Sequence, residues 1–280
     1  MRKAAIGARF GAAVWVLVAF LSCAQILGIT EPTSRTGGKG DAGSVDAATA
    51  EAAMAADAFA PTDASTADAA DGGQAGPPFY TVSTPTPPPA FLDACALTGS
   101  VTVLQAHDND VTMVAALPFA SAFSFYGAPV TKYWVNTNGV LGVDPSLPTI
   151  NPFVLCPLPM IGVPHPAIYA FADDLETRDS GICIATTGAE PNRQFVVTWK
   201  DAMLKGKTSS HLTFSVVLTE TTNTVDLAYE TLTGGTGGAA EGSGATIGLE
   251  DSTGMRTAQF SCRMPMLATT PIDVRFAPIP

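Results

Sequence analysis

Acidic side chains gather at one place in the second half of the chain. Asp173, Asp174, Glu176 and Asp179 follow a short apolar stretch, so we expect them on the loop after a strand. Carboxylate oxygens on a loop can hold Ca²⁺, which makes Asp173, Asp174 and Asp179 the candidate metal ligands. Their spacing is not that of an EF-hand, and adjacent residues of a strand point to opposite faces. We therefore prefer a solvated loop without a metal, with Ca²⁺ as the alternative and no other cofactor expected.

The same carboxylates allow a second kind of chemistry. Glycoside hydrolases use two carboxyl groups about 5 to 10 Å apart, and Asp173, Asp174 or Glu176 could supply them. The sequence alone does not place any two of them at that separation. A serine hydrolase is disfavoured, because no serine lies in a GxSxG motif. We predict that the protein is not an enzyme and keep a carbohydrate-active hydrolase as an alternative.

Aromatic side chains provide the candidate binding residues. Trp134 lies in a strand pattern, so we expect it in the core, although its ring could instead offer a face to a sugar. Tyr126 and Asn138 would then be its neighbours. These three residues are the ones that we assign to ligand binding from the sequence.

Strands must position all of these residues. From about residue 90 onward, short runs of β-branched and aromatic residues are separated by turn signals, which is typical of an all-β protein. The expected strands are residues 101–104, 123–125, 133–136, 140–143, 168–171, 182–186, 194–199, 212–219, 224–229, 245–250, 258–261 and 273–276. Strands of this number and spacing predict a two-sheet antiparallel β-sandwich with jelly-roll-like topology over residues 90–280.

Two of the connections between strands are predicted to be tight hairpins. The short link Glu220 to Asn223 joins two runs of alternating apolar residues, 212–219 and 224–229. In the second hairpin, Asn138 and Gly139 supply the positive φ angles that a tight turn requires.

The cysteines indicate an oxidising compartment. If Cys23 is set aside, an even set remains, made up of Cys95, Cys156, Cys183 and Cys262. Two disulfides are expected, and three pairings are possible. We prefer Cys95 with Cys262, because these two lie near the ends of the domain, and Cys156 with Cys183. A loop as long as the first would contribute about 4 to 5 kcal/mol in the chain-entropy model.

The first residues have the pattern of an export signal. A basic start precedes the apolar run 10–21, which is too short to span a bilayer comfortably. The tetrapeptide 20–23 resembles the lipobox of bacterial lipoproteins, although Phe20 and Leu21 are bulkier than that pattern usually has. The resemblance implies a signal peptide over residues 1–22 and an acylated Cys23, and Ala24 implies sorting to the outer membrane of a diderm bacterium. Ordinary secretion after cleavage at Ala24 is the alternative.

A linker is expected between the signal peptide and the domain. Residues 23–89 are rich in Ala, Asp, Gly and Pro and hold few large apolar side chains, so we expect a disordered tether. The net charge of −11 and the absence of a Lys or Arg cluster after the signal disfavour nucleic acid as a partner. Membrane attachment would then depend on the lipid.

The domain itself shows a resemblance to a known family. An apolar strand with a Tyr-Gly turn at 123–127 precedes the segment 133–141, with its Asn-x-Asn-Gly motif, as at the opening of nidogen-like extracellular domains. The likeness continues through residues 168–175, 191–199, 212–229, 245–250 and 259–262. It implies an extracellular interaction module and brings no catalytic residues with it.

These observations predict a lipid-anchored module at the bacterial cell surface. We expect it to bind a protein, matrix or glycan partner through loops at one end of the sandwich. A structural protein of the cell envelope and the carbohydrate-active hydrolase are the alternatives. The expected location is the outer membrane, or the extracellular medium if the chain is released.

Overall fold

The computed structural model describes residues 79–146, 156–159, 166–265 and 272–280. In these residues the chain is nearly all β, and every strand pair is antiparallel. The first sheet is eight-stranded and has the order β1 (Tyr80–Ser83), β16 (Ile272–Pro278), β13 (Val225–Thr233), β12 (His211–Thr219), β11 (Gln194–Leu204), β10 (Ile182–Thr187) and β2 (Val101–Leu104), with β9 (Leu175–Glu176) paired to β11.

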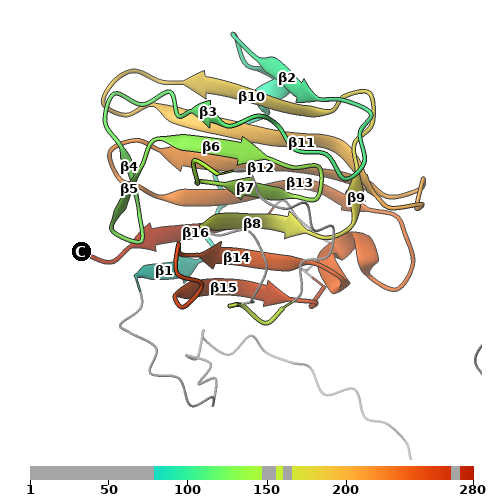
Figure 1. Cartoon of the computed structure of the whole chain (residues 1–280). Helices are drawn as coiled ribbons and strands as arrows, with labels where there is room; N and C mark the ends of the chain where they lie inside the picture. Colours follow the sequence, from blue (N-terminus) through green and yellow to red (C-terminus); the bar gives the residue numbers. More distant parts are fainter. Residues whose placement is uncertain (1–78, 147–155, 160–165, 266–271) are drawn as a thin grey trace, which may run out of the picture. The chain divides into compact units, whose positions relative to one another are not determined.

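The second sheet is six-stranded. Its order is β15 (Thr257–Cys262), β14 (Thr246–Glu250), β8 (Ala167–Ala172), β7 (Val140–Gly142), β6 (Lys132–Val135) and β3 (Ala115–Ala116). A separate pair is formed by β4 (Phe123–Phe125) and β5 (Ala128–Val130). Figure 1 shows the two large sheets stacked face to face, with β2 and β3 toward one edge and β1 and β15 at the other. The predicted all-β sandwich is confirmed.

The core lies between the sheets, because every second residue of each strand turns inward. Trp199 and Phe214 of the first sheet stack at 5.0 Å, and Phe171 of the second sheet lies 5.6 Å from Phe214. Polar atoms also cross the gap. Trp199 Nε1 donates to the carbonyl of Asn136 at 3.0 Å, and Tyr229 donates its hydroxyl to the carbonyl of Ala170 at 2.5 Å. The sheets are therefore fixed to each other by packing and by directional bonds.

A segment that includes the short 3₁₀ helix η1 (Ala94–Ala96) covers part of the outer face of the eight-stranded sheet. Leu92 and Ala94 pack there with Val196 and Val217. The Ala94 N–H donates to Thr198 Oγ1 at 2.8 Å, and the Leu92 carbonyl accepts from Ser215 Oγ at 2.9 Å. We call residues 92–97 the covering segment.

All of the strands expected from the sequence are present, with ends shifted by a few residues. Both predicted hairpins form, one between β6 and β7 and one between β12 and β13. In the first hairpin only Gly139 has a positive φ, 77°, so the predicted positive φ of Asn138 is wrong. The turn holds one residue more than a two-residue turn, since Val135 pairs with Leu141.

Two further expectations are corrected. The domain begins before the predicted residue 90, because β1 already pairs with β16 at Tyr80, so the predicted linker 23–89 ends too late. The strand has only four residues and follows low-complexity sequence, so no strand pattern is recognisable there. The signal peptide, Cys23 and residues 24–78 of the predicted linker lie outside the described residues.

The disulfide pairing is the second correction. The four cysteines do form two disulfides, but Cys95 joins Cys183 and Cys156 joins Cys262. The predicted pairing assumed that a disulfide ties the ends of the domain together. Instead, β1 and β16 already hold those ends by backbone pairing, and each disulfide fastens a segment to a strand.

The ends of the sandwich are formed by loops and one irregular turn. The π-helical turn η2 (Ala239–Ser243) lies between β13 and β14. Within the described residues, no helix has the length and apolar character needed to cross a membrane.

Candidate functional site

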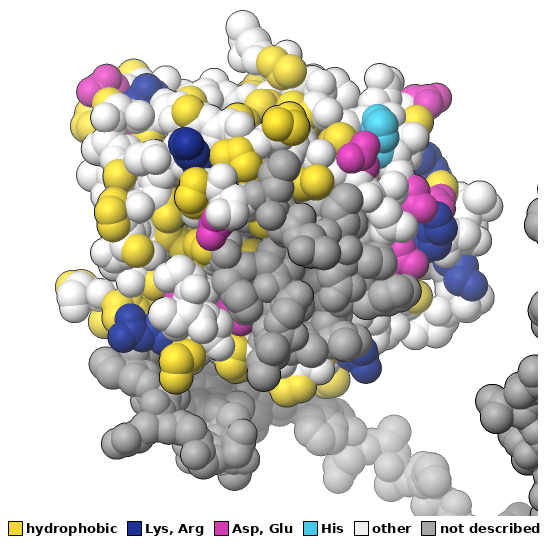
Figure 2. All heavy atoms as spheres, viewed as in Figure 1, with side chains coloured by type: hydrophobic (Ala, Val, Ile, Leu, Met, Phe, Trp, Pro, Cys, Tyr) yellow, Lys and Arg dark blue, Asp and Glu magenta, His cyan; other side chains and the backbone are white. Residues whose placement is uncertain are grey.

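Charged side chains gather at the end of the sandwich where β9 pairs with the end of β11. Figure 2 shows them at the right of the view, over the position of β9 in Figure 1. Three segments build this end, namely residues 105–110, the β8–β9 corner with the residues after β9, and the β11–β12 turn. We call this surface the charged end.

The predicted acidic cluster lies here but does not converge. Asp173 accepts from the Asp174 N–H at 2.8 Å and lies against Gly244, where an added Cβ would be 2.5 Å from its Oδ2. Burial raises the pKa of Asp173, and Arg263 opposes that rise. Asp174 instead lies near the charges of Asp108 and Lys205 on the neighbouring segments. Asp179 is exposed, and its carbonyl accepts from Gln105.

Ca²⁺ therefore finds no assembled site at the predicted residues. Asp173, Asp174 and Asp179 face different neighbours, and the described part of the chain holds no group of three or more His, Cys, Asp or Glu side chains arranged for a metal. The predicted calcium ligands are thus not supported. The physical reason is the alternation of side chains at the β8–β9 corner, which sends Asp173 and Asp174 apart.

A lysine provides the positive charge among the carboxylates. Lys205 Nζ contacts Asp108 and lies 2.6 Å from Glu176 Oε1. The two acidic residues are also neighbours through a backbone bridge. Hydrogen bonds to both carboxylates raise the pKa of Lys205. Burial and the nearby Asp108 raise the pKa of Asp174, and Lys205 opposes this.

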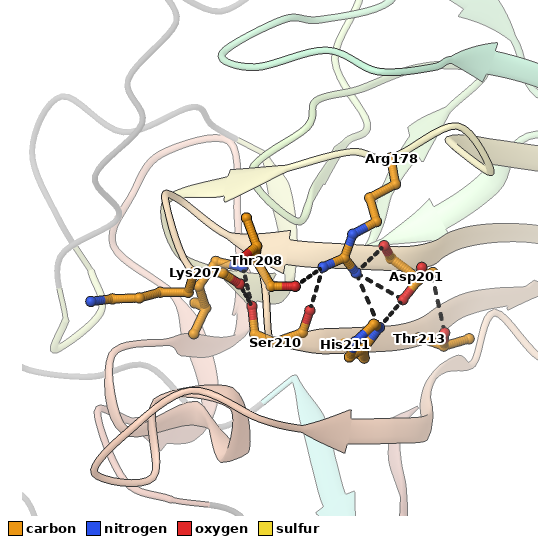
Figure 3. Close-up of polar contacts among 8 residues, drawn as sticks. Arg178, Asp201, Lys207, Thr208, Ser210, His211 and Thr213 are labelled. Atoms are coloured by element: carbon orange, nitrogen blue, oxygen red, sulfur yellow. Dashed lines mark hydrogen bonds and ion pairs between the residues drawn. The ribbon is translucent and has the colours of Figure 1, made fainter.

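A second network surrounds Arg178, which follows β9. Figure 3 shows its guanidinium pointing into the space between the strands at the β11–β12 turn. It donates to the carbonyls of Thr208 at 2.6 Å and Ser210 at 2.9 Å, and to Asp201 Oδ1 at 2.9 Å. One planar cation thus satisfies an acceptor of β11 and two carbonyls of the β11–β12 turn, which fixes the turn.

Asp201 and His211 complete this network. Asp201 has a φ of 52° at a register shift between β11 and β12, and its N–H donates to Thr213 Oγ1 at 3.1 Å. His211 Nδ1 lies 2.7 Å from Asp201 Oδ1, while its side chain is about half exposed. An Asp–His pair can serve a nucleophile in catalysis, but none of the hydrogen bonds of the described residues joins His211 to a hydroxyl or thiol.

The exposed tip of this end carries a further cation. Lys207 is exposed, and Figure 3 shows its side chain extending away from the Arg178 network, although its backbone helps to form the turn. His107 and Asp110, 2.8 Å apart, lie on the neighbouring segment. The charged end therefore combines the ion-paired side chains of Lys205 and Arg178, which are held in place, with exposed charges of both signs.

The three predicted binding residues are buried, which contradicts the role assigned to them. Trp134 is 1% exposed and lies across Gly142, where an added Cβ would be 1.9 Å from its ring. Asn138 is fully buried, accepts from the Leu175 N–H at 2.9 Å and donates to Asn109. Tyr126 is 8% exposed and donates to the Leu249 carbonyl at 3.2 Å. No sugar can stack on a ring buried in this way, so the core position that the sequence predicts for Trp134 is confirmed and the alternative role in sugar binding is wrong.

Lys205, Arg178, Asp201 and His211 were not identified from the sequence. Their partnership depends on the β11–β12 hairpin extending to Leu204 and His211, beyond the predicted strand ends. The Gly206 turn between two predicted strands was the available signal, since residues at equal distances from a hairpin turn face each other.

The chain is similar to one protein family. A family model described as NIDO related matches residues 80–274, from β1 to the middle of β16. Neither the comparison with curated proteins nor that with solved structures gives a match.

Proposed function

The chain belongs to the NIDO-related family, and from this premise we propose that it is a non-catalytic extracellular binding module. In this proposal the module is held at the surface of a diderm bacterium by a lipid on Cys23. The charged end binds the partner, and the partner is a protein.

The arrangement of the charged end is the observation that carries this proposal. Binding surfaces are commonly built from loops that a rigid scaffold holds in place. Here Arg178 ties β11 to the β11–β12 turn, and Lys205 joins the segment around Asp108 to β9. Binding to such a preorganised surface costs little conformational entropy.

The chemistry of the surface favours a protein partner. Lys207 and His211 are exposed at the charged end, which also carries the carboxylates of Asp108 and Asp110. Interspersed charges of both signs give specificity and set the orientation of a complementary protein surface. A polyanion such as a nucleic acid would be repelled by the net charge of −11.

The two disulfides support the extracellular location. Disulfides persist in oxidising compartments, and all four cysteines of the described residues are paired. The basic start and apolar run of residues 1–21 support export.

Photo-crosslinking on intact cells tests the proposal. A photoreactive residue replaces Lys207 in the full chain, and the same residue at Thr222, in the β12–β13 turn at the opposite end, is the matched control. We expect a specific protein adduct from position 207 only. Binding of the protein partner should weaken at least fivefold for Lys207→Glu but not for Thr222→Glu. Cys23→Ser should release the protein into the medium. Equal adducts from both positions, or no effect of Lys207→Glu, would contradict the proposed surface.

A further inference from the structure

One long side of the sandwich is open. Each large sheet ends in two terminal strands, β1 and β2 in the first sheet and β15 and β3 in the second. β1 and β15 contact each other and close one side. On the other side the terminal strands are β2 and β3, and they bound the surface that we call the open edge (Figure 1).

The free side of β2 can accept hydrogen bonds and donate them. β2 pairs only with β10, and no backbone hydrogen bond among the described residues joins its other side to another segment. Natural sheets usually protect such a strand with charged residues or proline. β2 contains neither, since it reads Val-Thr-Val-Leu, and only its short length and a register shift in its pairing with β10 protect it.

An apolar groove lies beside β2. Its volume is about 130 Å³, and its lining includes Val101, Ala116, Pro118, Tyr133, Ile184 and Phe195. Val101 is 54% exposed, and both residues of β3 are exposed. The groove thus has room for one aliphatic side chain immediately next to an unpaired strand.

The open edge is also free of charge along both of its strands. Residues 97–106 and 111–131, which contain β2 and β3, include no Asp, Glu, Lys or Arg. Figure 2 shows exposed apolar side chains in the upper part of the view, where Figure 1 places β2 and β3. A charged side chain placed in this groove would lose part of its hydration.

We propose that the open edge binds an extended, uncharged segment of a partner protein, which adds to β2 as a new strand. Backbone hydrogen bonds to β2 supply affinity, and an aliphatic side chain of the segment fills the groove and supplies specificity. This binding goes beyond the proposed function, because it uses a surface separate from the charged end.

A second copy of the chain is a poorer occupant. At about 3.3 Å per residue, β2 is only about 13 Å long, whereas a stable dimer buries roughly 1,200 to 2,000 Å². Each copy also carries a net charge of −11, which opposes self-association. A single extended segment requires only the edge and the groove.

A synthetic peptide tests the inference with the full chain. The probe is a labelled seven-residue peptide that alternates threonine with valine and is blocked at both ends. Its binding is measured by fluorescence anisotropy, and protection of the β2 amides by hydrogen exchange. We expect saturable binding, added protection at β2, and at least tenfold weaker binding when alternate backbone nitrogens of the peptide are methylated or glutamate replaces valine.

Two substitutions locate the binding. Val101→Lys places a charge at the groove, on a side chain already half exposed, and should weaken binding at least tenfold. Val82→Lys makes the same change at an exposed valine of β1 on the closed side and should leave binding unchanged. Lys207→Glu should also leave it unchanged, so failure at the charged end and failure at the open edge can be told apart.

Several results would overturn the inference. These are no peptide binding at millimolar concentration, equal binding by Val101→Lys and the unaltered chain, or binding that survives methylation of the peptide backbone. A concentration-dependent dimer in sedimentation that Val101→Lys abolishes would identify a second copy as the occupant instead.

Discussion

Asp273 is a buried carboxyl group whose neighbours do not favour its charge. It is 4% exposed on the outer face of the eight-stranded sheet, and its Oδ1 has no hydrogen-bond partner. Arg275 makes a two-pronged ion pair with Asp226 instead, at 2.6 and 3.2 Å. Burial raises the pKa of Asp273 to about 6, Asp226 adds to the rise, and Arg275 opposes it.

This pKa predicts how stability depends on pH. The pKa of Asp273 in the folded chain exceeds that of an unfolded aspartate, about 3.9. The contribution of Asp273 to the free energy of unfolding is therefore complete below pH 4 and is lost as pH rises through 6. Asp273→Asn removes that loss. We expect the free energy of unfolding of Asp273→Asn, relative to the unaltered chain, to rise by about 1–3 kcal/mol between pH 4 and pH 8, measured by urea unfolding.

Asp226→Asn provides a second test of this prediction, because it removes a charge that raises the pKa of Asp273 and should therefore reduce the loss of stability between pH 4 and pH 8. A difference between Asp273→Asn and the unaltered chain that is the same at every pH would refute the assigned pKa.

At the scale of the elements, Gly139 of the β6–β7 hairpin determines how closely the turn can approach β8. Gly139 has a φ of 77°, and its carbonyl accepts from the N–H groups of Ala170 at 3.0 Å and Phe171 at 3.3 Å. A Cβ at this position would lie 2.1 Å from the Phe171 carbonyl oxygen. The turn therefore needs glycine both for its backbone angle and for its contact with β8.

The two requirements can be separated with a second glycine. Gly206 has a φ of 66°, but a Cβ there would meet nothing within 4 Å. We expect Gly206→Ala to lower the free energy of unfolding by about 1 kcal/mol and Gly139→Ala to lower it by more than about 3 kcal/mol, because a steric overlap is added. Chemical denaturation of both variants checks this, and equal losses would show that the contact with β8 contributes nothing.

Alternation of apolar residues was enough to predict the longer strands, since a period of two is visible over four or more residues. β3 and β9 have two residues each and show no period, while β5 contains Pro129. Their pairing depends on what the rest of the fold brings beside them. The same limit explains the site, because Arg178 meets Asp201 and His211 only through the folded hairpin.

At the scale of the whole molecule, each disulfide fastens a segment that lies outside the sheets. Cys95 holds the covering segment against β10, and Cys156 holds residues 156–159 against β15. The sequence separations are 88 and 106 residues. Both loops are long enough for about 4 to 5 kcal/mol each in the chain-entropy model.

Removal of one disulfide should therefore weaken the domain strongly. We expect the pair of substitutions Cys95→Ser and Cys183→Ser to lower the free energy of unfolding by about 2–5 kcal/mol and to increase proteolysis within residues 84–97. Peptide mapping without reduction must first recover Cys95 linked to Cys183. Cleavage that begins in β15 instead would contradict the role given to this disulfide.

The position of the first disulfide also has a mechanical consequence. A force applied to the chain ahead of Phe79 enters the domain through β1, whose hydrogen bonds to β16 bear the load first. Once β1 is pulled away, the covering segment can follow only as far as Cys95, where a covalent bond to β10 takes the load. The chain between Phe79 and Cys95 then extends to roughly 55 Å. Under tension such a domain lengthens until the Cys95–Cys183 disulfide takes the load.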